Sequence, residues 1–118
     1  MIPTILAELH AALVRYLQTG ETYTIFINKM GLSQQEREAL HEHLGQGNVR
    51  IKLENTDEPA EWLESSISGI WLGVFYDHQG NPVLETVEVG AFPPVAGAQQ
   101  EDMQQGATQL GALLKQLA

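Results

Sequence analysis

The sequence predicts an α+β fold, a two-layer sandwich in which three helices cover one face of a mainly antiparallel sheet of about five strands. Three segments carry apolar residues at helical spacing, and five short runs are rich in β-branched, aromatic or alternating apolar residues. Turn residues separate these segments in the order α-β-α-β-β-β-β-α. A chain of 118 residues has the size of one domain, so residues 1–118 are expected to form a single domain.

The first helix is expected from Pro3 to about Thr19. Proline is well placed in the first turn of a helix, and Gly20 is a natural stop at its end. The apolar stripe consists of residues at helical spacing, namely Ile5, Leu6, Leu9, Leu13 and Leu17. A strand is expected over residues 22–28, where the sequence TYTIFIN is β-branched and aromatic.

Ser33 and Glu36 match a capping box, in which each side chain accepts a hydrogen bond from the backbone N–H of the other residue. A second helix is therefore expected from about Gln34 to near Leu44, before a glycine-rich break. Apolar and charged residues then alternate over residues 49–54, which predicts a half-exposed strand.

Residues 60–67 are open to two interpretations. Pro59 followed by AEWLE could begin a helix, with proline at its first position. The segment runs directly into the next apolar strand, however, and only Gly69 could end a helix before it. An extended strand is therefore preferred.

The stretch from Ser68 to Gly90 is predicted to be a β-hairpin around which the sheet is organised. Alternate residues of its first strand point to opposite faces, and both sets are apolar. Residues 77–82, DHQGNP, supply the turn, because glycine and asparagine tolerate positive φ and proline can begin the returning strand. The second apolar face must therefore be covered by other structure or serve as a contact surface.

The last helix is expected from about Gln99 to Leu117, after a rigid connection over the glycine- and proline-rich residues 90–97. It is assigned to the same face of the sheet as the other two helices. Gly106 and Gly111 each cost about 1 kcal/mol in a helix interior relative to alanine. Close packing of this helix against the sheet would offset that cost.

The composition excludes several classes of function. The net charge is −9, and the six basic residues are scattered, so neither nucleic acid nor an anionic membrane surface is an expected partner. No apolar run approaches the roughly 20 residues of a membrane helix, and the N-terminus lacks the features of a signal peptide, so a cytoplasmic location is expected. The chain has no cysteine, which excludes disulfides and thiolate chemistry.

The sequence offers little sign of catalysis. It has no nucleophile elbow, phosphate-binding loop or metal-ligand spacing, so no catalytic, cofactor-binding or metal-binding residue is assigned and no cofactor is expected. A non-catalytic binding module is the preferred interpretation. A small metal-handling protein or hydrolase that uses His41, Glu64 or Glu85 remains an alternative from another class.

Several segments in order resemble the C-terminal conserved domain of the HupH/HyaF hydrogenase expression and formation proteins. They are LGQGNV from Leu44, ESSISGIW from Glu64, ETVEV from Glu85 with the following FPPV, and EDMQQG from Glu101 with its leucine-rich tail. Ser65 stands where that family has threonine, and longer family members carry more than one such unit. The resemblance implies a chaperone-like accessory factor in the maturation of nickel–iron uptake hydrogenases. Its partner would be a hydrogenase subunit precursor or a fellow maturation protein.

Five residues are candidates for contact with that partner. Trp62, Trp71 and Phe75 are chosen because aromatic side chains dominate interface energetics, and Glu85 and Glu88 lie on the returning strand of the hairpin. The alternative for the three rings is an ordinary place in the core. A third interpretation of the chain is a self-associating module, a homodimer that buries the second sheet face.

Overall fold

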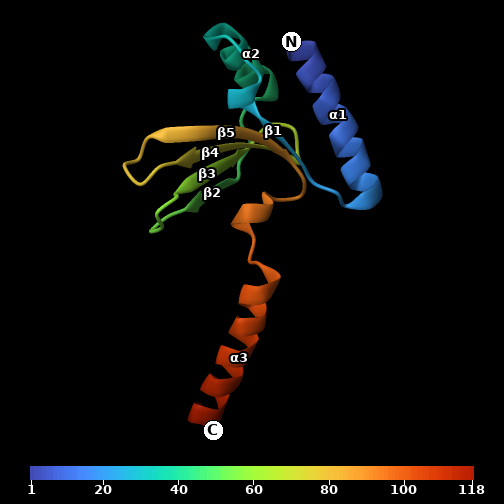
Figure 1. Ribbon diagram of the computed structural model, residues 1–118. Coiled ribbons are helices and arrows are strands. Elements are labelled where there is room, and N and C mark those ends of the chain that lie inside the picture. The colour runs from blue at the N-terminus through green and yellow to red at the C-terminus, as the bar shows by residue number, and fades with distance from the viewer.

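The computed structural model describes residues 1–118 (Figure 1). Its sheet is antiparallel throughout, with the strand order β1-β5-β4-β3-β2. The elements in chain order are α1 (Ile2–Thr19), β1 (Tyr23–Phe26), the 3-10 turn η1 (Ile27–Lys29), α2 (Gln34–Leu44), β2 (Arg50–Leu53), β3 (Ala60–Glu64), β4 (Ile70–Tyr76), β5 (Pro82–Val89), the 3-10 turn η2 (Pro94–Ala96) and α3 (Gln100–Leu117).

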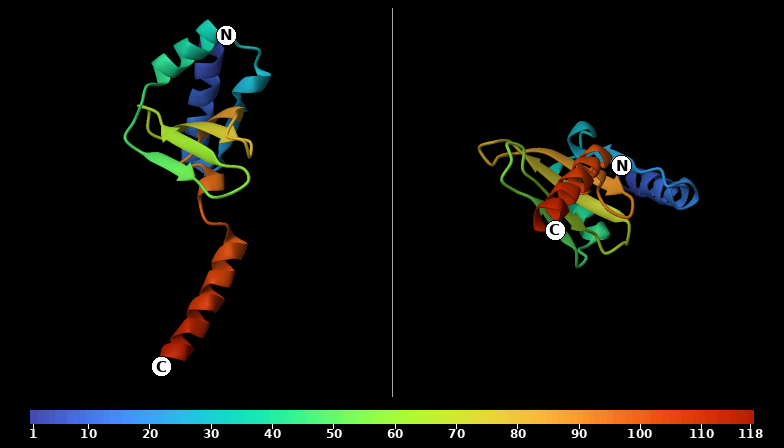
Figure 2. Two further views of the ribbon diagram at one scale, coloured as in Figure 1. Left: turned by 90° about the vertical axis from the view of Figure 1, so that its left-hand side faces the viewer. Right: turned by 90° about the horizontal axis from the view of Figure 1, so that it is seen from below.

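The α+β fold and the five-stranded antiparallel sheet are confirmed, but the third helix is not where the sequence placed it. α1 and α2 cover one face of the sheet, whereas α3 projects from the opposite side and buries none of its residues (Figures 1 and 2). The expectation of three helices on one face is therefore wrong for α3. This projection makes the molecule long, with principal extents of 60 × 39 × 24 Å.

The connection after β5 sends α3 to the far side. The indole Nε1 of Trp71 donates a hydrogen bond to the carbonyl of Gly90 at 3.1 Å, which fixes the start of the connection. Pro93 is fully buried, and Ala96 packs on the second face of the sheet. The chain therefore leaves the body on the face opposite α1 and α2.

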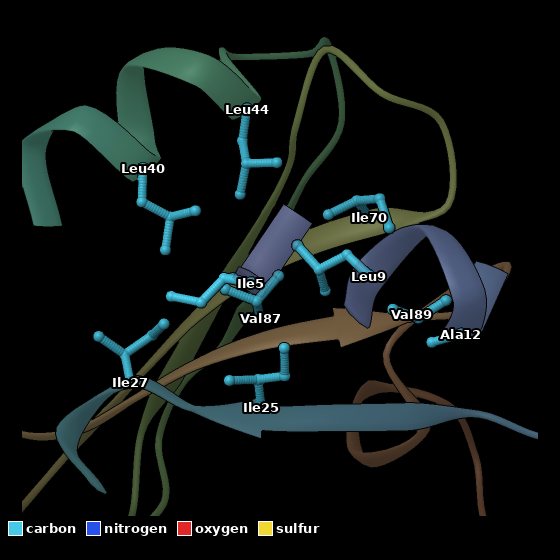
Figure 3. Close-up of a cluster of buried hydrophobic side chains, with 10 residues drawn as sticks. All are labelled: Ile5, Leu9, Ala12, Ile25, Ile27, Leu40, Leu44, Ile70, Val87 and Val89. Carbon is cyan, nitrogen blue, oxygen red and sulfur yellow. The ribbon is translucent and has the colours of Figure 1, made fainter. Parts of the chain in front are cut away.

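The main core lies between the sheet and the two packed helices (Figure 3). It is aliphatic, and each packed helix contributes one apolar stripe, as its residue spacing predicts. The buried residues are Ile5, Leu9, Ala12, Ile25, Ile27, Leu40, Leu44, Ile70, Val87 and Val89.

The local predictions hold at most element boundaries. Gly20 adopts a left-handed conformation (φ 75°) at the end of α1. Ser33 and Glu36 form both hydrogen bonds of the capping box, each 3.1 Å long. Residues 60–64 are a strand, which settles the ambiguous segment in favour of extended structure.

β1 is shorter than predicted because a side chain replaces its backbone pairing. The chain turns into η1 after Phe26, and the side-chain Oδ1 of Asn28 accepts a hydrogen bond from the backbone N–H of Glu85 at 2.6 Å. Ile27 nevertheless remains buried on the helix-covered face. None of the three helices has the length and apolar character needed to cross a membrane.

Candidate functional site

The second face of the sheet carries a small aromatic cluster. Trp62 is 0% exposed and Trp71 is 3% exposed, and they pack with Ala60. Phe75 lies edge-on to Trp62, with ring centroids 5.5 Å apart, and is only partly buried. The two tryptophans therefore belong to the core of this structure, and neither presents a free surface to a partner.

Glu88 is also buried, at 4% exposure, and is held by two hydrogen bonds. Its Oε2 accepts one from the indole Nε1 of Trp62 at 2.8 Å and one from the hydroxyl of Thr86 at 2.7 Å. Gly73 lies against all three, because a Cβ there would come 2.4 Å from the Thr86 hydroxyl. This carboxylate holds the cluster together from inside. It is buried, although the sequence analysis chose it as a candidate for partner contact.

A row of apolar side chains crosses four strands beside this cluster. Pairing between strands aligns Leu53 with Ala60, Ala60 with Phe75, and Phe75 with Leu84. Ala60 is buried, Phe75 and Leu84 are half-buried, and Leu53 is 38% exposed. We call these four residues the apolar row. Its partly exposed members lie beside the buried Trp62, on the face against which Ala96 of η2 packs.

Acidic side chains lie along one side of the apolar row, in the loops that follow its strands. The β2–β3 and β4–β5 loops lie next to each other there, and a surface hollow is lined by Asp57, Glu58, Asp77 and His78. Asp77 accepts hydrogen bonds from the backbone N–H groups of Asn81 and Gln79, both 2.9 Å long. The bond from Asn81 is the largest cause that lowers the pKa of Asp77. The carboxylate therefore stays ionised at neutral pH.

Glu85 lies on the other face, at the rim of the main core. Its carboxylate is 3.4 Å from a guanidinium nitrogen of Arg37 and 4.0 Å from Nε2 of His41, and it is 29% exposed. This ion pair joins α2 to β5. Sequence spacing did not identify Arg37, because the two residues are 48 positions apart.

The three residues of the metal or hydrolase alternative do not gather in one place. His41 and Glu85 approach each other, but Glu64 instead accepts a hydrogen bond from the backbone N–H of Gly69 at 3.4 Å. The structure contains no group of three or more histidine, aspartate or glutamate side chains arranged to hold a metal ion. A proton-transfer role for His41 and Glu85 would have to operate beside the guanidinium of Arg37.

A shallow cleft of about 300 Å³ lies between α1 and the start of β1. Its lining includes Glu8 and Tyr23. The pKa of the Tyr23 phenol is raised mainly by its hydrogen bond to Glu8 and, to a smaller extent, by burial. A phenol held in its neutral form is a hydrogen-bond donor and a poor base. This pair links α1 to the edge strand and gives the cleft no evident chemistry.

Two of the sequence motifs meet in space. The backbone N–H of Gly47 donates to the carbonyl of Glu64 at 2.7 Å, and the Ser66 hydroxyl donates to the carbonyl of Leu44 at 2.6 Å. A Cβ at Gly47 would lie 2.5 Å from the Ser65 carbonyl oxygen. The glycine is thus needed because two backbones approach each other closely there. The two motifs connect the end of α2 and the start of β2 to the end of β3.

The chain matches one family model over residues 2–117, described as the HupH hydrogenase expression protein, C-terminal conserved region. Two curated relatives are both named hydrogenase expression/formation protein HoxQ. The protein from Azotobacter vinelandii is 28% identical over 108 residues, which cover 90% of this chain and 38% of the relative. The protein from Cupriavidus necator is 27% identical over 113 residues, 96% of this chain and 40% of the relative. The chain therefore spans about two fifths of their length.

A solved structure has the same fold. The hydrogenase expression protein HupH from Thiobacillus denitrificans superposes with a TM-score of 0.85 at 23% sequence identity. The match covers 98% of this chain and 95% of the other.

Proposed function

Since the chain belongs to the family of the HupH hydrogenase expression protein, C-terminal conserved region, we propose that it is a non-catalytic accessory factor in hydrogenase maturation. In this role it binds a hydrogenase subunit precursor or a fellow maturation protein in the cytoplasm. The names of the two relatives, hydrogenase expression/formation protein, support the pathway.

The apolar row is the observation that carries the proposed mode of binding. Leu53, Phe75 and Leu84 lie on one face of the sheet, and Phe75 packs edge-on against the fully buried Trp62. Accessible apolar side chains anchored on a buried aromatic residue are typical of the centre of a protein interface. Of the five residues chosen from the sequence, Phe75 is the one that keeps a contact role in this proposal.

The acidic loops beside the row indicate the chemistry of the bound segment. Asp57, Glu58 and Asp77 lie in these loops, and the whole chain carries a net charge of −9. A segment with apolar side chains and neighbouring lysine or arginine would match both features. Such binding weakens as salt concentration rises, because exposed charges more than about 10 Å apart are screened at 0.1 M ionic strength.

Two neighbouring residues offer a matched test. Leu84 belongs to the apolar row, whereas Val83 points to the opposite face of β5 and is 55% exposed. With a purified hydrogenase subunit precursor in a calorimetric titration, Leu84→Gln is expected to weaken binding by about tenfold or more. Val83→Gln should leave the affinity unchanged. Equal effects of the two variants, or none from either, would refute the apolar row as the binding surface.

A further inference from the structure

α3 exposes an apolar surface that the rest of the chain does not cover. Of the 16 large hydrophobic side chains that are exposed, seven lie in the last 27 residues: Phe92, Val95, Met103, Leu110, Leu113, Leu114 and Leu117. Leu114 is 70% exposed and Leu117 is 77% exposed. Such a concentration of apolar side chains on one projecting helix and the connection before it marks an interaction surface.

Five apolar residues of α3 follow the spacing of a coiled coil. Starting at Met103, they recur after four, three, four and three residues, at Ala107, Leu110, Leu114 and Leu117, and Leu113 lies beside this line. This places every one of them at an a or d position of a heptad, the narrow seam that two helices share when they pack at a shallow angle. A helix that packs on a sheet usually has a wider apolar stripe. We call these five residues the seam.

We propose that the seam pairs with the seam of a second copy of this chain, so that two α3 helices form a short antiparallel coiled coil. Charge is the first argument for a second copy. The positions that flank the seam are Gln104, Gly106, Gly111 and Leu113, and none of them is charged. Two chains that each carry a net charge of −9 can therefore meet along this line without like charges facing each other.

The glycines also favour this arrangement. No atom lies within 4 Å of a Cβ built at Gly106 or Gly111, so neither glycine is required by packing within the chain. Each costs about 1 kcal/mol in a helix interior relative to alanine. Beside the seam, their small size lets the backbone of a second helix approach closely, which gives the two residues a physical role.

The ends of the helix favour the antiparallel direction. Glu101 and Asp102 lie in the first turn of α3 and Lys115 lies in the last. Antiparallel pairing brings the acidic turn of one helix near the basic turn of its partner and opposes the two helix dipoles. It also places the two acidic bodies at opposite ends of the pair. A parallel pair would instead bring both bodies and both acidic turns together.

The area available sets the expected strength. α3 has 18 residues. At about 1.5 Å rise per residue the helix is roughly 27 Å long, and two such helices bury on the order of 1,000 Å² in total. Phe92 and Val95, which are 55% and 54% exposed at the base of α3, extend the contact to the end of the partner helix. This is near the lower limit for a specific interface, so we expect a dissociation constant on the order of micromolar.

Sedimentation velocity of the full chain, from about 1 µM to about 500 µM, tests the dimer. The wild-type chain is expected to change from monomer to dimer over this range. Leu110→Glu combined with Leu114→Glu places charge in the seam and should leave only monomer. The control, Gln105→Glu with Ala112→Glu, adds the same charge at exposed positions on the opposite side of α3 and should keep the dimer. A wild-type monomer at the highest concentration, or a dimer that survives the seam variant, would overturn the proposal.

Cysteine cross-linking tests the geometry, since the chain has no native cysteine. In an antiparallel pair the a positions of one helix face the d positions of the other, so Ala107→Cys chains should form disulfide-linked dimers with Leu110→Cys chains under mild oxidation, whereas Ala112→Cys chains should form none. For direction, a mixture of Met103→Cys and Leu114→Cys chains should cross-link to each other and not to themselves. Self-cross-linking of Met103→Cys would exclude the antiparallel arrangement. These experiments use the chain alone, so their outcome is independent of whether a hydrogenase subunit precursor binds the apolar row.

Discussion

The two faces of the sheet are both apolar, yet they are covered in different ways. On one face, α1 and α2 bury aliphatic side chains such as Leu9 and Leu40 against Val87. On the other face, no helix packs, and Trp62 is buried by neighbouring side chains, a short connection and a hydrogen-bonded Glu88. A strand pattern with two apolar faces thus indicates burial on both sides but does not say which kind of element supplies it.

The two faces also differ in how much apolar surface stays accessible. On the helix-covered face, α1 and α2 bury the aliphatic core, whereas the second face keeps the apolar row, with Phe75 and Leu84 half-buried. One face therefore holds the fold together, and the other combines a small core with accessible surface. Four main variants, each with its comparison where the chain offers one, test this distinction, in decreasing order of the effect expected from the main variant.

Trp62→Ala should show that the second face contains a true core. The substitution removes a fully buried ring and leaves the Glu88 carboxylate without its indole donor. We expect a loss of about 3–5 kcal/mol in the free energy of unfolding. Trp62→Phe, which keeps a smaller ring and loses the donor, should cost about 1–3 kcal/mol. Urea unfolding measures both, and an unchanged stability of Trp62→Ala would make the tryptophan a surface residue after all.

Gly73→Ala tests how tightly that core is packed. The new Cβ would lie 2.4 Å from the Thr86 hydroxyl oxygen and 2.9 Å from Oε2 of Glu88. Because neighbours must shift, we expect a loss of about 1–3 kcal/mol in the free energy of unfolding. Gly106→Ala on α3 is the control, and should be neutral or stabilising by up to about 1 kcal/mol. If both substitutions had the same effect in urea unfolding, the second face would be loosely packed.

Leu114→Ala compared with Leu9→Ala distinguishes the projecting helix from a packed one. Leu9 is 3% exposed and Leu114 is 70% exposed. Leu9→Ala should cost about 2–5 kcal/mol, whereas Leu114→Ala should change the free energy of unfolding by less than about 0.5 kcal/mol. Thermal unfolding at concentrations below the dimer range provides the measurement. Equal losses would mean that α3 packs on the body.

Asp77→Asn should have the smallest effect, and it concerns acid sensitivity. Hydrogen bonds from backbone N–H groups, that of Asn81 first, lower the pKa of Asp77 in the folded chain. Its carboxylate therefore contributes stability that is complete above the unfolded-state pKa of about 3.9 and is lost as pH falls through the lower folded-state value. The variant should show a shallower fall in melting temperature below about pH 4. If the melting temperatures of Asp77→Asn and of the wild-type chain fell equally as pH is lowered, the hydrogen bonds of Asp77 would not contribute to acid sensitivity.

Much of the fold could be predicted from short stretches of sequence. The capping box at Ser33 and the glycine stop at Gly20 were identified correctly because their partners lie within a few residues. The hairpin was identified because alternation and a turn occur together between β4 and β5. The candidate site was predicted less well. Trp62, Trp71 and Glu88 were chosen as candidates for partner contact, with the core as the alternative for the two rings, and the structure buries all three.

The sequence by itself determined the elements, because helix caps, turns and periodic apolar patterns depend on interactions within a few residues. The position of α3 could be known only from the folded structure. The same is true of the Arg37–Glu85 ion pair between α2 and β5, and of the row formed by Leu53, Phe75 and Leu84. Those features depend on strand register and on the path of the connection after Gly90. Both are set by contacts between residues far apart in the chain, which a single sequence does not display.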